Sequence, residues 1–317
     1  MGVANICAFT QGPLNRLANA FRYVFAPFFP SEWALKSVEP KGFTVSKVKR
    51  GIFKLFIYYL LFSPMIAMPF YNTCIFHPFM AGDFDLKEIA GVKKQDVFFS
   101  TAGGSRLHGW LFSQKGAKKT VLVSHGNAGN LTHRTDLIAL LLRSGASVLI
   151  YDYRGFGRSQ GQASVNGCCD DALAAYDFLS KDLHVPSDQI VLYGESIGTG
   201  FTAQLSAKRP CAGIILQSAF KSLPEIALEK LPYMSIYPTC FYPINNLNTI
   251  SILGGVHPPL LLIHGKQDAI IPYHNAQDLF QAATGAKQLV SLPKAGHNDI
   301  TSNVNPELLS ALSKILR

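Results

Sequence analysis

The stretch IVLYGESIGTG, residues 190–200, decides how this 317-residue chain folds. Its first four residues form an apolar run typical of a buried β-strand, and residues 197–208 suit a helix. Between them, Gly194, Ser196 and Gly198 fit the pattern G-x-S-x-G in the strand–turn–helix setting that this pattern requires. Glycines flank the serine because side chains at these two positions would clash in so tight a turn. We therefore expect Ser196 to project above the edge of a sheet as a candidate nucleophile.

Two later segments supply the partners that a reactive serine needs. A serine hydroxyl becomes nucleophilic when a general base accepts its proton and a carboxylate orients that base. The apolar, β-like residues 260–264 lead to Asp268, and a second such run at 288–292 leads to His297. Parallel strands place their carboxyl ends along one edge of a sheet, where sites form. We therefore expect His297 to act as the base and Asp268 to orient His297.

The same edge is expected to hold backbone donors for the oxyanion that forms in acyl transfer. Residues 120–124 form another β-like run, which ends in a glycine-bearing turn beginning at His125. We assign the first donor to the backbone N–H of Asn127 in this turn. The second is the N–H of Ile197, the residue after the candidate nucleophile. His125 is interpreted as a residue that shapes the turn and not as a base.

Four motifs follow one another along the chain: HGNAGN at 125–130, DYRGFGRSQG at 152–161, GESIG at 194–198 and GHND at 296–299. Together they make residues 85–317 resemble the α/β-hydrolase superfamily. Within it, the chain looks like a member of a membrane-anchored branch with the HGNAGN loop, which includes protein depalmitoylases and related single-pass membrane serine hydrolases. The resemblance implies an α/β fold with a mostly parallel central sheet flanked by helices. It also implies a catalytic triad of Ser196, Asp268 and His297.

The pattern of residues 85–317 fits this fold class, because apolar β-like runs alternate with helical patterns. The runs predict strands at 96–100, 107–112, 120–124, 147–152, 190–193, 213–217, 260–264 and 288–292. Helices are expected at 131–143, 167–182, 197–208, 274–283 and 306–316. Residues 218–259 form an insert without a strand pattern that is rich in apolar and aromatic side chains. We interpret it either as a short cap that favours an acyl chain or as ordinary packing on the sheet edge.

Residues beside the predicted site receive structural interpretations. Glu195 occupies the variable position of the serine motif, and we expect it to face solvent or to bond a loop. Asp152 is expected to tie down the loop that follows it. Asp299 is expected to cap the turn just after His297. His264, at the end of a predicted strand, is expected to be structural too.

Positive charge is concentrated toward the N-terminus, where residues 1–54 carry eight Lys or Arg and two Glu. They lead into residues 52–71, an apolar run with the single charge of Lys54. At ~1.5 Å per residue a helix of this length crosses the ~30 Å core of a bilayer. We expect a membrane-anchoring, single-pass helix here, with an interfacial hairpin or a helix packed on the hydrolase body as alternatives. The positive-inside rule then keeps the basic segment 1–51 in the cytosol.

Other features of the chain bear on this topology. A helix lying on a membrane, or docked on the body, is predicted by the spacing of Leu14, Leu17, Phe21 and Val24. Cys7 is a candidate for acylation. The vicinal pair Cys168 and Cys169 does not suit a disulfide framework, and small buried cysteines fit a reducing compartment. The side of the membrane that holds the hydrolase domain therefore stays open.

Several classes of partner are not expected. The sequence has no metal-ligand spacing, Walker loop or dinucleotide fingerprint, so neither a metal nor a cofactor is predicted. The basic residues are not interleaved with base-stacking groups, so nucleic acid is not expected. The sequence predicts a membrane-anchored serine hydrolase that cleaves a lipidic ester or thioester, like an acyl-protein thioesterase or a lysophospholipase. The alternatives are a peptidase of the same superfamily and a non-catalytic membrane scaffold.

Overall fold

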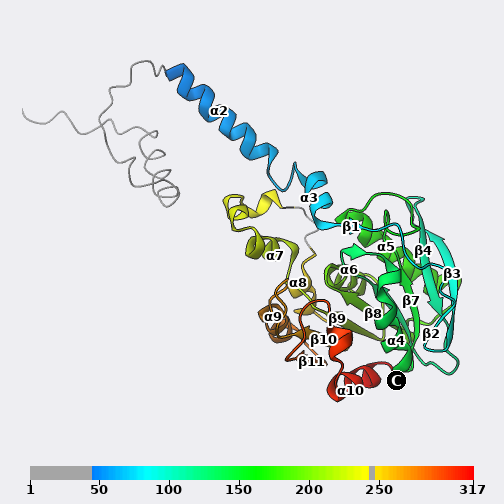
Figure 1. Cartoon of the computed structure of the whole chain (residues 1–317). Coiled ribbons are helices and arrows are strands. Elements are labelled where there is room, and N and C mark those ends of the chain that lie inside the picture. Colours follow the sequence, from blue (N-terminus) through cyan, green and yellow to red (C-terminus); the bar gives the residue numbers. More distant parts are fainter. Residues whose placement is uncertain (1–44, 243–246) are drawn as a thin grey trace, which may run out of the picture. The chain divides into compact units, whose positions relative to one another are not determined.

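A computed structural model describes residues 45–242 and 247–317 of the chain. The predicted helix at Leu14 to Val24 and the candidate acylation site Cys7 lie outside these residues. The chain divides into two units, and the second, Tyr58–Arg317, contains the described strands and every residue of the predicted site. Figure 1 shows the elements of this unit coloured along the chain. The fold of this second unit therefore determines where the site residues lie.

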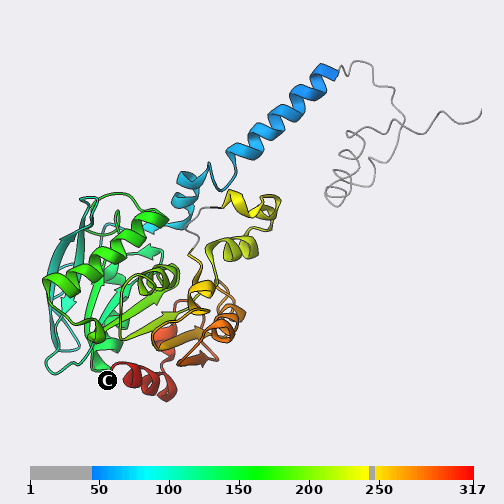
Figure 2. The ribbon, with the colours of Figure 1, turned by 180° about the vertical axis from the view of Figure 1, so that it is seen from behind.

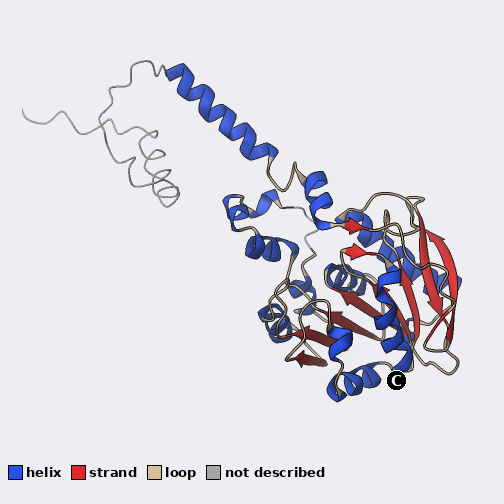
Figure 3. Cartoon of the chain, in the orientation of Figure 1, coloured by secondary structure: helices blue, strands red, loops and turns tan. Residues whose placement is uncertain are grey.

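Nine strands of the second unit form one mixed sheet in the order β11-β10-β9-β8-β5-β7-β4-β3-β2. Neighbouring strands from β11 to β7 pair in parallel, whereas β4, β3 and β2 continue the sheet in antiparallel pairs. Figure 3 shows the strands as one layer with helices on both sides, and Figure 2 gives the view from behind. The strands are β2 (Glu88–Ile89), β3 (Val92–Ser100), β4 (Arg106–Phe112), β5 (Thr120–Ser124), β7 (Ser147–Tyr151), β8 (Ile190–Glu195), β9 (Gly213–Gln217), β10 (Leu260–Gly265) and β11 (Lys287–Leu292).

Helices bury both faces of this sheet, so its central strands are apolar on both sides. In β5, Val121 and Val123 pack in one core cluster with α4 (Thr135–Arg143) and α10 (Pro306–Ile315). The residue between them, Leu122, packs in a second cluster with α5 (Val165–Asp177) and α6 (Ile197–Ser206). A third cluster joins β9 and β10 to α8 (Thr249–Leu253) and α9 (His274–Ala282). Each fully buried Leu or Phe contributes about 1.5–3 kcal/mol, so these clusters hold the sheet edge in place.

The eight predicted strands are all present, with ends that differ by at most four residues. The five predicted helices are present too, but two of them change type along their length. The first begins as the 3-10 helix η3 (Leu131–Arg134), and the second ends as the π-helix η4 (Phe178–Asp182). Further 3-10 turns are η5 (Ser187–Gln189) and η8 (Ile300–Asn303). A separate parallel pair, β1 (His77–Pro78) with β6 (Ala128–Gly129), was not predicted, because two residues show no periodicity.

The insert between β9 and β10 is helical. It contains α7 (Leu223–Lys230), the 3-10 helices η6 (Pro232–Ile236) and η7 (Thr239–Phe241), and α8. Helix α7 begins where the sequence allows, because the Ser222 hydroxyl caps its first turn and Pro224 occupies a position that needs no donor. Only five residues lie between the end of β9 and the start of α7, so the insert begins at the carboxyl edge of the sheet.

The apolar run 52–71 does not form the single helix that we expected. Helix α2 (Val45–Leu61) ends inside it, a turn follows, and α3 (Met68–Ile75) begins afresh with Pro69 in its first turn. Pro64 explains the break, because a proline ring clashes with the carbonyl four residues earlier and offers no donor to it. That carbonyl, of Leu60, accepts instead from the amide and hydroxyl of Ser63. Across residues 45–242 and 247–317, no helix is both long enough and apolar enough to cross a bilayer.

Candidate active site

Ser196 lies in a sharp turn between β8 and α6, as the sequence predicts. Its backbone has φ 54° and ψ −120°, a conformation that L-residues adopt rarely and that costs energy. A Cβ on Gly198 would lie 2.0 Å from the carbonyl oxygen of Ser124, and one on Gly194 would lie 2.6 Å from Cα of Thr199. Glycine is therefore required at both positions. The first turn of α6 lies directly against the backbone at the ends of β5 and β8, and no side chain fits between them.

The structure brings the three residues of the predicted triad together. The Ser196 Oγ lies 3.0 Å from Nε2 of His297, and Nδ1 of His297 lies 2.7 Å from Oδ2 of Asp268. A carboxylate only accepts hydrogen bonds, so Nδ1–H of His297 donates to Asp268. In the neutral imidazole Nε2 is then left to accept from the serine hydroxyl. This is the arrangement in which a histidine can take the serine proton.

Asp268 is held ionised by the donors around it. Its Oδ1 accepts from the backbone amides of Ile270, at 2.9 Å, and Ile271, at 2.7 Å. Nε2 of His264 lies 3.4 Å from Oδ2, a contact that sequence reasoning missed because the strand-end position of His264 carries no motif. Burial would raise the pKa of the Asp268 carboxyl, but the two histidines and the Ile271 amide hold that pKa well below its usual range. The carboxylate can thus orient His297 and stabilise its protonated form.

Asp299 holds the loop that carries His297, which corrects its interpretation as a cap of the following turn. Its side chain does not cap the next 3-10 helix. Instead Oδ1 accepts from the backbone amide of Gly296 at 2.6 Å, and Oδ2 and the carbonyl oxygen accept from Asn303. The last residue of the GHND motif therefore fixes the position of the histidine two residues before it.

The two predicted oxyanion donors lie beside the serine. Asn127 and Ile197 line the same cleft as Ser196. Neither backbone N–H donates a hydrogen bond to an acceptor within residues 45–242 and 247–317. Ile197 is the first residue of α6, where N–H groups lack helical partners and carry the positive end of the helix dipole. The two amides can therefore donate to an oxygen that bears negative charge.

Glu195 bonds the loop that contains Asn127, which is one of the two roles expected for it. Its Oε2 accepts from Nε of Arg134 at 2.6 Å and from the amide of Gly126 at 3.3 Å. The Arg134 guanidinium also donates to the carbonyl oxygen of Ala128 at 3.1 Å. The ion pair thus holds the loop on both sides of Asn127.

A mostly apolar cleft with space of about 380 Å³ opens at Ser196. The insert contributes Phe220, Leu223 and Ile226 to it, and the loop after β10 contributes the residues from Ala269 to Ile271. No carboxylate of the described residues lines the cleft, whose one charged side chain belongs to Lys230. The Lys230 ammonium donates to the carbonyl oxygen of Ala269 at 2.8 Å. Apart from the serine and its donors, the cleft therefore presents hydrocarbon to a ligand.

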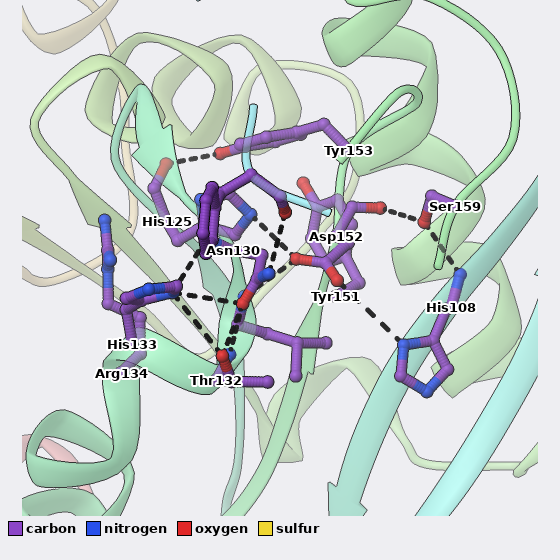
Figure 4. A network of polar contacts seen from close by, with 12 residues as sticks. His108, His125, Asn130, Thr132, His133, Arg134, Tyr151, Asp152, Tyr153 and Ser159 are labelled. Carbon is purple, nitrogen blue, oxygen red and sulfur yellow. Dashed lines mark hydrogen bonds and ion pairs between the residues drawn. The ribbon is translucent and has the colours of Figure 1, made fainter. Parts of the chain in front are cut away.

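A second aspartate–histidine group lies deeper in the domain (Figure 4). Asp152 follows β7 and is fully buried; its Oδ1 accepts from the amide of Leu131 at 2.8 Å and lies 3.4 Å from Nε2 of His125. Its Oδ2 lies 3.9 Å from Nδ1 of His108. Burial would raise the pKa of the Asp152 carboxyl, but the two histidines and the Leu131 amide keep the pKa below its usual value. Asp152 holds the loop after it through its carbonyl oxygen, which accepts from Ser159.

Comparisons with known proteins agree with the fold. Residues 115–236 match the family described as serine aminopeptidase, S33. An uncharacterized protein of Mycobacterium tuberculosis is 37% identical over 217 residues, which cover 68% of this chain and 74% of that protein. The uncharacterized protein YfhR of Escherichia coli K12 is 33% identical over 218 residues, 66% of this chain and 75% of its own.

A solved structure shares the fold as well. The Pyrococcus furiosus esterase Pf2001 superposes with a TM-score of 0.63 at 22% identity, over 76% of this chain and 96% of the esterase. The family match, the relatives and the fold show that the chain belongs to the α/β-hydrolase superfamily, and they support a hydrolase activity. In the part of the chain that the structure describes, no group of three or more His, Cys, Asp or Glu side chains is placed to hold a metal ion.

Proposed function

We propose that this hydrolase cleaves esters or thioesters with an apolar acyl group through a serine acyl-enzyme. The observation that carries the proposal is the hydrogen-bonded series Ser196–His297–Asp268 at the opening of an apolar cleft. Serine, imidazole and carboxylate in this order form the arrangement that activates a hydroxyl for attack on a carbonyl carbon. The strained backbone of Ser196 supports the same role, because such strain concentrates at functional sites.

The proposed reaction has two halves. Ser196 Oγ attacks the carbonyl carbon while its proton passes to Nε2 of His297, and the amides of Asn127 and Ile197 donate to the oxyanion. The tetrahedral intermediate then expels the alcohol or thiol, which takes the proton from His297, and leaves an acyl-serine. A water molecule repeats the sequence with His297 again as base, releasing the carboxylic acid and the free serine. Asp268 remains ionised throughout and stabilises the imidazolium.

The lining of the cleft favours an acyl chain over a charged substrate. Each methylene that moves from water into such a lining gains about 0.8 kcal/mol. We therefore propose lipidic acyl groups, carried by a protein thioester or a lysolipid, as the substrate class. A panel of p-nitrophenyl esters of rising chain length, with acyl thioesters and aminoacyl anilides beside them, tests this. We expect kcat/KM to rise with chain length; a preference for the anilides would contradict the proposal.

The alternative of a peptidase is favoured by the description of the matching family. An aminopeptidase needs carboxylates near the cleft to bind the substrate ammonium group. Of the nearby carboxylates in the described residues, Glu225 binds Lys221, and Glu229 binds His274. Neither lines the cleft, so the ester hydrolase is the better fit. A non-catalytic scaffold is disfavoured because the whole hydrogen-bonded series from Ser196 to Asp268 is in place.

We further propose that helix α2 attaches the chain to a lipid surface. Large apolar side chains of α2 are exposed, among them Phe53 at 62% and Phe56 at 53%, next to the basic Lys49, Arg50 and Lys54. Apolar side chains combined with basic ones suit the boundary of an anionic membrane. Co-sedimentation with anionic vesicles should fall when Phe53 and Phe56 are changed to serine. Equal sedimentation of this variant and the wild type would contradict the attachment.

A further inference from the structure

The asparagines of the HGNAGN motif bind a segment that lies far from them in the sequence. This segment, residues 75–81, is called the strap here and joins α3 to the body of the domain. The side-chain amide of Asn127 donates to the carbonyl oxygen of Ile75 at 2.9 Å. The side-chain amide of Asn130 donates to the carbonyl oxygens of Phe79 and Ala81, both at 2.7 Å. The side-chain amides of both asparagines therefore donate to the strap.

Backbone pairing adds to this contact. The strand pair β1–β6 runs along the strap, with the amide of His77 donating to the carbonyl oxygen of Asn127 at 2.9 Å and that of Phe79 donating to Gly129 at 3.1 Å. The strap is anchored in turn by Phe76, which is 4% exposed and packs near the rings of Phe156 and Phe201. The loop is therefore bound to an element that is itself fixed in the core.

These contacts determine where the amide of Asn127 points. The peptide between Gly126 and Asn127 is planar and trans, so its N–H points opposite to the carbonyl of Gly126. That carbonyl accepts from Nδ1 of the buried His125 at 2.7 Å, and the other ring nitrogen of His125 faces Asp152 (Figure 4). His125 thus fixes the Gly126 carbonyl of this peptide. The strap fixes the carbonyl and the side chain of Asn127.

We propose that the strap is a positioning element that holds the Asn127 amide at the reaction centre, and that the two asparagines of the motif exist to bind it. This rests on the proposed function, because positioning matters only if that amide stabilises an oxyanion. Such donors act when they are preorganised, and loss of one costs about 10²–10³ in kcat in other hydrolases. A donor that is displaced but still present should cost less, about tenfold.

Two matched pairs of variants in the full chain test the strap. Asn130→Asp keeps the oxygen that caps η3 at Thr132 but turns a carboxylate toward two carbonyls. Its control is Asn305→Asp. Asn305 also caps a helix, α10, but it does not contact the strap. His77→Pro removes one amide donor, and Phe76 before it already has the extended backbone that a proline requires. His77→Ala keeps that donor and changes the same exposed side chain.

We expect Asn130→Asp and His77→Pro to lower kcat on a p-nitrophenyl ester about tenfold with KM within about twofold. The inhibition constant of a trifluoromethyl ketone, whose adduct carries an oxyanion, should rise by a similar factor. Both controls should stay within about twofold of wild type, and circular dichroism should show all four variants folded. If one test variant fails to fold, the kcat and inhibition constant of the other test variant and its control still test the strap.

The outcomes separate the strap from the proposed function. An active wild type with unchanged kcat and inhibition constant in the folded test variants would overturn the strap alone. A change confined to KM would overturn it as well, because a displaced oxyanion donor acts on the transition state. A folded wild type that hydrolyses no ester or thioester would overturn the ester hydrolase and, with it, the catalytic meaning of the strap.

Discussion

Two buried aspartates lie at the same edge of the sheet, one after β10 and one after β7, and each faces two histidines. Asp268 faces His297 and His264, and Asp152 faces His125 and His108. Only the first group ends at a serine hydroxyl and an open cleft; Asp152 and both of its histidines are fully buried. The comparison teaches that residue types alone do not make a reactive centre. A nucleophile, a route for substrate and free donors must be present too.

The largest expected effect separates the two groups by their histidines. His297→Ala, like Ser196→Ala, removes a member of the proposed triad and should lower kcat by at least about 10³-fold. His108→Asn changes the group around Asp152 at the histidine that does not contact the loop of Asn127. The activity of its folded fraction should stay within about threefold of wild type. Steady-state kinetics corrected for the folded fraction measures both. Equal losses in both variants would break the comparison.

The next effect concerns the aspartates. Asp268→Asn should lower kcat by about 10²–10⁴-fold. A neutral amide at this position does not hold His297 in the tautomer with a proton on Nδ1, and it does not stabilise the protonated ring. Asp152→Asn should instead lower the free energy of unfolding by about 1–3 kcal/mol, through weakened bonds to buried donors, and change kcat by no more than about fivefold. Urea denaturation and kinetics on the same samples test the pair. A catalytic loss in Asp152→Asn as large as in Asp268→Asn would assign the buried group a direct role.

The apolar cleft distinguishes the two groups further, because it opens at the Asp268 group only. Ile226→Trp fills part of the lining, and we expect it to lower kcat/KM about tenfold for octanoyl esters while acetyl esters change little. Leu309→Trp, at an exposed position of α10, is the matched control and should leave the profile unchanged. If the chain-length profile of Ile226→Trp matches that of wild type, the acyl group binds elsewhere.

The smallest effect is one that the two groups share. The pKa of both carboxyls is lowered in the folded chain. Such a carboxyl stabilises the fold above the pKa of the unfolded chain, about 3.9, and loses this contribution as the pH falls through the folded pKa. Relative to Asp152→Asn and Asp268→Asn, the wild type should lose on the order of 1 kcal/mol between about pH 6 and pH 3. Denaturation at several pH values measures this, and a wild-type advantage that grows toward acid would have the wrong sign.

The sequence predicts the sheet and the candidate site well because both depend on local patterns. The apolar runs of β5, β8 and β10 are continuous, as strands buried on both faces must be. The serine motif follows β8 and Asp268 follows β10, whereas His297 follows the partly buried edge strand β11. Once parallel strands are assumed, their carboxyl ends meet at one edge without further information.

The remaining features depend on contacts between segments far apart along the chain. The strap contacts the HGNAGN loop through two residues of strand, too few for a periodic signal. The contact between His264 and Asp268 depends on how a polar turn folds back after its strand. The run 52–71 looks continuous by hydropathy, but hydropathy does not record that Pro64 and the hydroxyl of Ser63 end the helix.

The central claim is that the hydroxyl of Ser196 is the nucleophile of this protein. The most direct test is reaction of the folded wild type with a fluorophosphonate, followed by intact mass and peptide mapping. We predict one adduct, on Ser196, with no adduct on Ser196→Ala and greatly slowed labelling of His297→Ala. Folded wild type that stays unlabelled, or an adduct on a different residue, would contradict the claim.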